Sequence, residues 1–295
     1  MKVVFFYMSL AFIGIAKLLP IRVLYLVSDI IYYIIYYLVR YRRSVVYKNL
    51  HEAFPEKTGK DIKKIAKKFY RHLSDMFVEY IILDKLNSKK LEKRVKFKNH
   101  EMAKDLLNNN KNVVLVSAHY GNWELPCIIG KIMSGNSEII AVYKRLNNKY
   151  WDKWFLKLRS KFGAKLVEMH DIFRHLISNK NKGINSLTIL ISDQRPKAYD
   201  MKYFVNFLKH EGTAVFLGAE RLAKGFDAAV FYADVQKIKR GYYEVEFIPI
   251  TTDPKKAVEY EITNTHVKIL ENIICMKPEY WLWSHKRWKL TRQNL

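Results

Sequence analysis

A histidine and a carboxylate stand five positions apart in the segment Ala118-His119-Tyr120-Gly121-Asn122-Trp123-Glu124. The segment follows the apolar run of residues 113–116, which is typical of a buried parallel strand. Chemistry in open α/β sheets usually takes place at the carboxyl ends of strands, so we expect His119 there as a general base. Five helical steps would place His119 and Glu124 about 140° apart, so these two side chains need a turn between them to meet.

The sequence supplies that turn. Gly121 and Asn122 favour it, and Pro126, which a helix tolerates only in its first turn, places a helix start near residues 123–125. Glu124 can then fold back to hydrogen-bond one imidazole nitrogen and leave the other free to take a proton, while nearby amides stabilise an oxyanion. This arrangement suits the activation of a hydroxyl. A histidine after a strand is also often a structural hydrogen-bonding residue, and that alternative stays open.

The segment resembles the His-x4-Asp/Glu signature of glycerolipid acyltransferases. In its longer form, with Gly-Asn-Trp, it is similar to the lipid A biosynthesis acyltransferase family, the late lauroyl and myristoyl transferases. Further similar segments follow in the family's order: residues 43–55, Val142-Tyr143-Lys144, Ser192-Asp193-Gln194, residues 207–223, and the Trp-x-Trp-x-His-x-Arg-Trp-Lys element within residues 278–289. Arg145 departs from the pattern, because members commonly have proline there.

The resemblance implies an α/β fold of the glycerolipid acyltransferase type, with a mixed sheet flanked by helices and an N-terminal hydrophobic membrane-anchor helix or helix pair. It implies that His119 and Glu124 are catalytic. Asp200 lies in the loop region where related enzymes carry an acidic residue near the histidine. The residues expected to bind the substrates are Tyr120, Asn122, Trp123, Lys144, Arg145, Asp193, Gln194, Asp200 and Arg287.

Several of these residues also have a simpler interpretation. Asp193 follows the apolar run of residues 187–191, so it lies at the same sheet edge as His119 or caps a loop. Lys144 and Arg145 could bind a phosphate of the acyl carrier's prosthetic group or of the acceptor lipid, or simply be solvated. If residues 281–287 are extended, alternate side chains share one face, either as packing residues or with Arg287 as a ligand contact.

Composition independently narrows the class of protein. The chain has 295 residues, 49% of them hydrophobic, which is enough for a sizeable core. Its 52 lysines and arginines against 28 aspartates and glutamates give a net charge of +24, which predicts a polyanionic partner. The two cysteines, Cys127 and Cys275, have no spacing typical of structural zinc or a disulfide framework, and we expect Cys127 to be a buried, inert thiol.

The first 43 residues are expected to anchor the protein to a membrane. Residues 3–39 are mostly apolar and aromatic, and they end at the basic cluster Arg40-Tyr41-Arg42-Arg43, which would hold the catalytic part on the cytoplasmic side. The anchor is either one tilted span or a helix pair, broken at Pro20, that lies at the interface. A core helix of a soluble domain is the alternative. Tyrosines at positions 32, 33, 36, 37 and 41 favour the interface.

Residues 44–295 are expected to form the acyltransferase domain, with a helical lead-in at 44–95 and an α/β core at 96–295. Strand-like runs at 113–118, 138–143, 187–192, 228–235 and 243–250 alternate with helical stretches near 124–133, 147–161, 171–179, 213–224 and 257–275. This rhythm is typical of βαβ units.

The predicted reaction is the transfer of a fatty acyl chain from an acyl carrier protein thioester to a hydroxyl of a lipid A precursor, at the cytoplasmic face of a bacterial inner membrane. The resemblance implies no metal and no cofactor, with acyl carrier protein or acyl-coenzyme A as co-substrate. Other acceptors stay open, namely an aminolipid, a lysophospholipid or a phosphoinositide mannoside, as does a thioesterase that uses the same histidine. We expect no nucleic-acid partner, since no helix-turn-helix, RRM or zinc-finger signature accompanies the charge.

Overall fold

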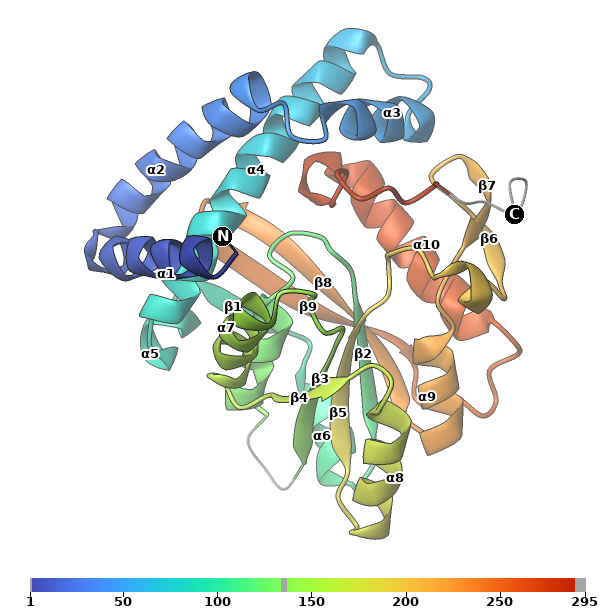
Figure 1. Ribbon diagram of the computed structural model, residues 1–295. Helices are drawn as coiled ribbons and strands as arrows, with labels where there is room; N and C mark the ends of the chain where they lie inside the picture. Colours follow the sequence, from blue (N-terminus) through green and yellow to red (C-terminus); the bar gives the residue numbers. More distant parts are fainter. Residues whose placement is uncertain (1, 134–136, 290–295) are drawn as a thin grey trace.

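The computed structural model describes residues 2–133 and 137–289. Seven strands form one mixed sheet in the order β1-β9-β8-β2-β5-β3-β4, with helices on both faces (Figure 1). Neighbouring strands are parallel except for β8 and β9, which are antiparallel. The strands are β1 (Val95–Lys98), β2 (Val113–Ser117), β3 (Glu138–Tyr143), β4 (Lys165–Glu168), β5 (Ser186–Ile191), β8 (Ala229–Lys239) and β9 (Tyr242–Thr251). A separate antiparallel hairpin pairs β6 (Phe204–Phe207) with β7 (His210–Ala214).

Strand β2 lies in the middle of the sheet and is buried at every position. Its alternate side chains enter two different hydrophobic cores, because successive residues of a strand point to opposite faces. Val114 and Val116 face α8 (Ile172–Asn181), α9 (Gly218–Phe226) and α10 (Glu261–Met276). Val113 and Leu115 face α6 (Glu101–Asn108) and α7 (Lys149–Ser160). The continuous apolar run in the sequence therefore marks a strand covered on both sides.

The N-terminal helices form a layer across one end of the sheet (Figure 1). These helices are α1 (Lys2–Leu18), α2 (Ile21–Tyr33), which continues as a π-helix over Ile34–Leu38, α3 (Arg43–Ala53) and the long α4 (Gly59–Lys85). Pro20 separates α1 from α2, which is the helix-pair alternative of the two that the sequence left open. A capping box between Thr58 and Asp61 starts α4 by satisfying free amides of its first turn. Helix α2 packs on the outer side of α4.

All five expected strands are confirmed, as β2, β3, β5, β8 and β9. The helical stretch expected near residues 124–133 is a short 3₁₀ helix, η2 (Leu125–Lys131). Two expectations were wrong. The helix expected from residue 213 begins at Gly218, because β7 occupies residues up to 214. Strands β8 and β9 form a long hairpin, which interrupts the βαβ rhythm.

Six described elements of three to five residues were absent from the expectation, because such short segments carry little periodicity. They are β1, β4, β6, β7, and the 3₁₀ turns η3 (Ala198–Asp200) and η4 (Pro278–Tyr280). The short helix α5 (Ser88–Glu92) lies within the expected helical lead-in.

Candidate active site

Three segments that are far apart in the sequence meet at the carboxyl end of β2. The amide of Ser192 donates to Ser117 O at 3.0 Å, because β5 lies beside β2. On the other side, the amide of Leu282 donates to His119 O at 3.1 Å, and an isolated bridge joins Tyr120 to Trp281. His119 is therefore at the sheet edge where the sequence placed it, between the loop after β5 and the C-terminal segment.

The imidazole of His119 is held by Asp193. His119 Nδ1 lies 2.6 Å from Asp193 Oδ1, and the indole Nε1 of Trp281 donates to Asp193 Oδ2 at 2.9 Å. Since an ionised carboxylate only accepts, Nδ1 carries the proton in this pair, and Nε2 is left with its lone pair. The side-chain amide nitrogen of Gln194 lies 3.2 Å from that Nε2. The side chain of His119 is 20% exposed, so part of the imidazole is accessible from the surface.

Asp193 is ionised at every pH at which the protein would work. Burial alone would raise the pKa of its carboxyl, but the electrostatic interaction with the His119 side chain and the hydrogen bonds from His119 and Trp281 outweigh burial and lower the pKa to about 2. A buried, charged carboxylate fixes the orientation and the tautomer of the imidazole. The arrangement can therefore support a histidine that accepts a proton during a reaction.

Glu124 does not contact the imidazole, and this expectation was wrong. Its carboxylate accepts two hydrogen bonds from Arg159 of α7, from Nε at 2.7 Å and from Nη2 at 2.8 Å. Glu124 is only 5% exposed, and a planar guanidinium matches both oxygens of a buried carboxylate better than an imidazole can. Burial alone would lower the pKa of Arg159, but its hydrogen bonds to Glu124 and the electrostatic attraction to that side chain outweigh burial and raise the pKa above its ordinary value. Arg159 therefore keeps its charge.

Helix α4 holds the turn between His119 and Glu124 in place. His72 donates through Nε2 to Gly121 O at 3.1 Å, and burial lowers the pKa of this histidine to about 3, so it is neutral. Glu79 accepts a hydrogen bond from the side-chain amide of Asn122 at 2.9 Å. Gly121 has a φ of 58°, and a Cβ there would collide with the carbonyl oxygen of Val235. Only glycine fits this position of the turn.

Of the three residues Tyr120, Asn122 and Trp123, two have buried side chains and one has a side chain at the surface of the site. Tyr120 is 2% exposed and donates its hydroxyl to Lys277 O at 3.0 Å, and Asn122 is 1% exposed. Both side chains are thus engaged inside the protein. The ring of Trp123 is partly exposed and lies edge-on to His119, with 5.2 Å between ring centres. Of these three expected substrate contacts, Trp123 is the one positioned to meet a ligand beside the imidazole.

The remaining expected residues lie at different distances from the imidazole. Lys144 and Arg145 are exposed directly after β3, and Arg145 pairs with Glu168 at 3.1 Å. Asp200 is exposed in η3, and the acidic residue against the histidine is Asp193 instead. The loop after β5 reaches His119 through its first residues and has turned outward by Asp200. The roles of Lys144 and Arg145 toward a ligand stay predictions.

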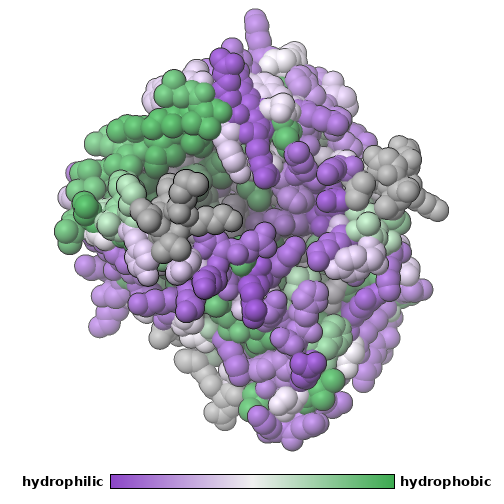
Figure 2. Space-filling model, in the orientation of Figure 1, coloured by the Kyte–Doolittle hydropathy of each residue, from purple (hydrophilic) through white to green (hydrophobic). Residues whose placement is uncertain are grey.

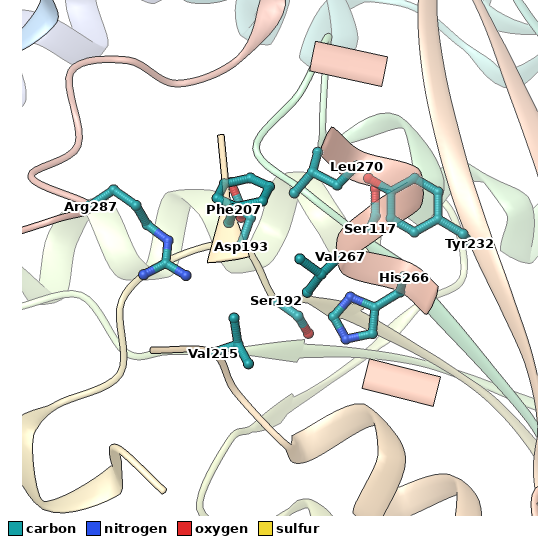
Figure 3. A pocket seen from close by; sticks show the side chains of 10 residues that line it. All are labelled: Ser117, Ser192, Asp193, Phe207, Val215, Tyr232, His266, Val267, Leu270 and Arg287. Atoms are coloured by element: carbon teal, nitrogen blue, oxygen red, sulfur yellow. The ribbon is translucent and has the colours of Figure 1, made fainter. Parts of the chain in front are cut away.

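Arg287 is buried behind the site, where it lines a small internal cavity of about 10 Å³ next to Asp193 (Figure 3). Its Nη2 donates to Ala214 O at 2.6 Å, and burial lowers its pKa to about 10. A cavity of that size has room for about one water molecule. Its other walls are mostly apolar, with Phe207, Val215, Tyr232, Val267 and Leu270 labelled around Asp193 in Figure 3. Apolar side chains therefore border Asp193 on this side.

The C-terminal segment is a series of turns rather than an extended strand, so its expected alternation does not form one face. Trp281 and Trp283 are buried in the core, which confirms the packing interpretation for both. Cys127 is buried as expected, and burial raises the pKa of its thiol to about 12. Among residues 2–133 and 137–289, no group of three histidine, cysteine or acidic side chains is placed to hold a metal ion.

Sequence reasoning missed four residues that support the site, namely His72, Glu79 and Arg159 as partners of the motif, and Trp281 as a donor to Asp193. Three of them lie on helices whose sequence pattern describes only which face is buried. A charged residue at a buried helix position, such as Glu79 in α4, was the one available signal.

Comparison with known proteins shows the family of the chain. The sequence profile described as bacterial lipid A biosynthesis acyltransferase matches residues 1–290. The chain belongs to this family. It is therefore an acyltransferase. Similar relatives include lipid A biosynthesis acyltransferase 2 of Shigella flexneri, 22% identical over 259 residues, which cover 86% of this chain and 79% of the relative.

Two relatives from Escherichia coli K12 are similarly distant from this acyltransferase. The lipid A biosynthesis palmitoleoyltransferase is 22% identical over 253 residues, covering 84% of this chain and 79% of the relative. The lipid A biosynthesis myristoyltransferase is 20% identical over 243 residues, covering 82% and 73%. The acyl groups in these names differ, so family membership leaves the acyl chain of this enzyme open.

Proposed function

We propose that this acyltransferase moves a fatty acyl chain from an acyl carrier protein thioester to a hydroxyl of a lipid A precursor, with His119 as general base. The observation that carries the proposal is the imidazole fixed at Nδ1 by Asp193, with its ring beside the partly exposed Trp123. Family membership and the names of the relatives support a lipid A-type acceptor. The reaction uses no cofactor other than the thioester, for which acyl-coenzyme A is the alternative donor.

In the proposed step, His119 Nε2 takes the proton of the acceptor hydroxyl as the hydroxyl oxygen bonds to the thioester carbonyl carbon. In the structure the side-chain amide of Gln194 lies against this nitrogen, and the acceptor hydroxyl takes the place of that amide. Backbone amides of the turn, or Lys144 or Arg145, stabilise the oxyanion. The carbon–sulfur bond then breaks, and the thiolate leaves with the proton from the imidazolium. Asp193 stays charged throughout and stabilises the imidazolium.

Surface charge supports the proposed partners. The net charge of +24 suits an acidic carrier protein, the phosphates of a lipid A precursor and an anionic inner leaflet. Lys144 and Arg145 are exposed at the carboxyl edge of β3, in the same sheet as His119, where a phosphate of either substrate can reach them. We place the enzyme at the cytoplasmic face of the inner membrane, where acyl carrier proteins reside.

Purified full-length enzyme with acyl carrier protein thioester and a lipid A precursor tests the proposal by mass spectrometry of the lipid. We expect an acylated precursor and thiol release that depends on that precursor. Thiol release at the same rate without any acceptor would instead indicate a thioesterase. Acylation of a lysophospholipid or a phosphoinositide mannoside, in place of the lipid A precursor, would contradict the proposed acceptor while keeping the chemistry.

The proposed donor is tested by salt. Transfer from the acidic carrier should weaken as salt rises, because the screening length shrinks from about 10 Å at 0.1 M to about 3 Å at 1 M. Acyl-coenzyme A should be the poorer donor and the less salt-dependent one. The double variant Lys144→Ala/Arg145→Ala should lower the use of both donors if these residues hold the shared phosphopantetheine arm, and of the carrier alone if they meet the protein surface. Equal, salt-independent rates with both donors would contradict the carrier hypothesis.

A further inference from the structure

Helices α1 and α2 expose an apolar face on the outside of the molecule. Figure 2 shows a continuous hydrophobic area where Figure 1 places α2. Its members are large side chains with 41–83% of their surface exposed, a state that costs free energy in water. On α1 they are Tyr7, Met8, Phe12, Ile15 and Leu18, and on α2 with its π-helical end they are Leu26, Ile30, Tyr33, Ile34, Tyr37 and Leu38. We call this set the outer apolar face.

The opposite side of α2 is fixed to the catalytic part by polar contacts. Ser28 donates to Asp75 of α4 at 2.7 Å, and Arg240, from the turn between β8 and β9, reaches Asp29 and Asp75, each at 2.7 Å. Tyr25 donates to the buried Glu79 at 3.3 Å. Helix α2 therefore packs on the folded domain with one face and presents apolar side chains outward with the other.

These contacts are incompatible with α2 crossing a bilayer. Among the described residues, Ile21–Leu38 is the one helical stretch long and apolar enough to span, and its 18 residues measure about 27 Å against a hydrocarbon core of about 30 Å. A spanning α2 would either carry Asp29, Arg240 and α4 into the hydrocarbon or break away from Asp75. The first is unfavourable because charged side chains are costly in hydrocarbon, and the second because it breaks the contacts of Ser28 and Asp29 with Asp75 and Arg240.

Basic residues border the outer apolar face. Lys67 of α4 lies 6.0 Å from the ring centre of Tyr37, and Arg71 lies 5.0 Å from that of Tyr32. Lys60, Lys63 and Lys64 are exposed on the same helix, and Arg22 is exposed in the first turn of α2. An apolar strip with cations along its edge is complementary to anionic headgroups above acyl chains.

We infer that α1 and α2 lie in the plane of one leaflet of an anionic bilayer, with the outer apolar face among the acyl chains, and that neither helix crosses the membrane. The inference rests on the membrane location proposed above, and it concerns geometry rather than the reaction. Helix α4 packs on the inner side of α2 and also holds the turn after His119. The catalytic edge is therefore one helix layer away from the lipid surface.

Binding to vesicles tests the surface. Full-length protein is sedimented with vesicles of phosphatidylglycerol and phosphatidylcholine, and Ile30→Asp is compared with Ile177→Asp on α8. Both isoleucines are exposed, by 60% and 52%, but Ile177 lies on a different face of the molecule. Ile30→Asp should weaken vesicle binding at least about tenfold, since it removes an apolar side chain from among the acyl chains and puts a charge there. Ile177→Asp should leave binding unchanged. If both variants weaken binding equally, or if neither weakens it, the assignment of this face is wrong.

Labelling of single cysteines tests the in-plane orientation. In a Cys275→Ser background, Arg22→Cys places an exposed thiol at the start of the apolar stretch Ile21–Leu38, Lys60→Cys places one after its end, and Cys127 stays buried. A membrane-impermeant maleimide should label both thiols in inverted inner-membrane vesicles and neither in spheroplasts. Labelling of the two thiols from opposite sides would show that α2 spans. If Ile30→Asp changes the oligomeric state in light scattering and leaves vesicle binding intact, the face joins two copies of the chain and the inference is wrong.

Discussion

Two buried carboxylates at the same edge of the sheet have opposite kinds of partner. Glu124 and Asp193 are 5% and 7% exposed. Glu124 is paired with a guanidinium on α7, and Asp193 with an imidazole and an indole. An arginine keeps its proton at any pH that a protein survives, whereas a histidine can take and release one near neutrality. The first pair is therefore suited to holding the loop, and the second to moving a proton.

The sequence motif suggested that Glu124 both shapes the turn and orients His119, whereas in the structure Asp193 is the carboxylate that contacts the imidazole. We expect Glu124 to act on the site through structure, because Arg159 fixes the start of η2, which follows the motif. We expect Asp193 to act on the chemistry, because its charge is felt directly by the imidazole. A substitution of Asp193 should therefore lower turnover, whereas a substitution of Glu124 should mainly lower the stability of the fold.

The largest effect is expected from His119→Ala. Removal of a general base lowers kcat by roughly 10² to 10⁴, and the core should be undisturbed because the side chain is at the edge of the sheet. Steady-state kinetics with purified enzyme measure the loss, and circular dichroism and vesicle binding serve as controls for folding and membrane association. Turnover near that of the wild type would remove the basis of the mechanism.

Asp193→Asn should come next, with a fall in kcat of about 10- to 10³-fold. The amide retains the shape but lacks the charge that stabilises the imidazolium, and it can hold the imidazole in the wrong tautomer. KM for the acyl donor should change little, because Asp193 is buried beneath the imidazole and does not meet the donor. The matched control is Trp281→Phe, which removes one hydrogen bond to Asp193 but leaves its charge, and should cost less. An equal loss in both variants would assign Asp193 a packing role.

Glu124→Gln should affect folding more than catalysis. A neutral amide leaves the partly buried Arg159 without its counter-charge, and breaking one partner of a buried pair typically costs about 3–5 kcal/mol. Since Gln keeps one hydrogen bond, we expect a loss of about 2–4 kcal/mol in the free energy of unfolding, measured from thermal midpoints. The kcat of the folded variant should fall less than that of His119→Ala. A kcat loss as large as that of His119→Ala, with unchanged stability, would place Glu124 in the chemistry after all.

A third buried carboxylate, Asp234, gives the smallest effect. It is 8% exposed and accepts hydrogen bonds only from the amide of Gln236 among the described residues, at 2.8 and 3.0 Å. Burial raises its pKa to about 6. Because this folded-state pKa is above the unfolded value of about 4, its contribution to stability is fully present below pH 4 and is lost as the pH rises through 6.

Asp234→Asn should therefore raise the free energy of unfolding by about 1–3 kcal/mol at pH 8 and change it little at pH 4. Thermal midpoints at the two pH values measure the difference. Asp193 has the opposite sign, since its lowered pKa gives a contribution that is present above pH 4 and is lost as the pH falls toward 2. A gain that is independent of pH would show that Asp234 is not the titrating group.

The residues that sequence reasoning located correctly are those whose position follows from local order. His119 follows β2 because four consecutive apolar residues require a buried strand, and Asp193 follows β5 for the same reason. Their meeting was predictable as a shared edge, since parallel strands of one sheet end on the same side. The contact itself required that β5 be the immediate neighbour of β2, and several strand orders are compatible with the same sequence pattern.

The partner of Glu124 shows where sequence reasoning ended. Five positions separate Glu124 from His119, and a tight turn made their contact reasonable. Arg159, 35 positions away, takes both oxygens because α7 packs over η2. Sequence periodicity describes which face of α7 is buried, but not which buried group that face meets.

The sequence by itself determined the class of fold, the strands that carry His119 and Asp193, the break at Pro20 and the excess of positive charge. Each follows from composition or from periodicity over a few residues, where local physical chemistry decides. Only the tertiary structure decided the pairing of the two carboxylates, the burial of Arg287 and the attachment of α2 to α4 through Asp75. A buried charge must find its counter-charge or donors wherever the packed chain brings them, and that place is set by strand order and helix packing rather than by distance along the sequence.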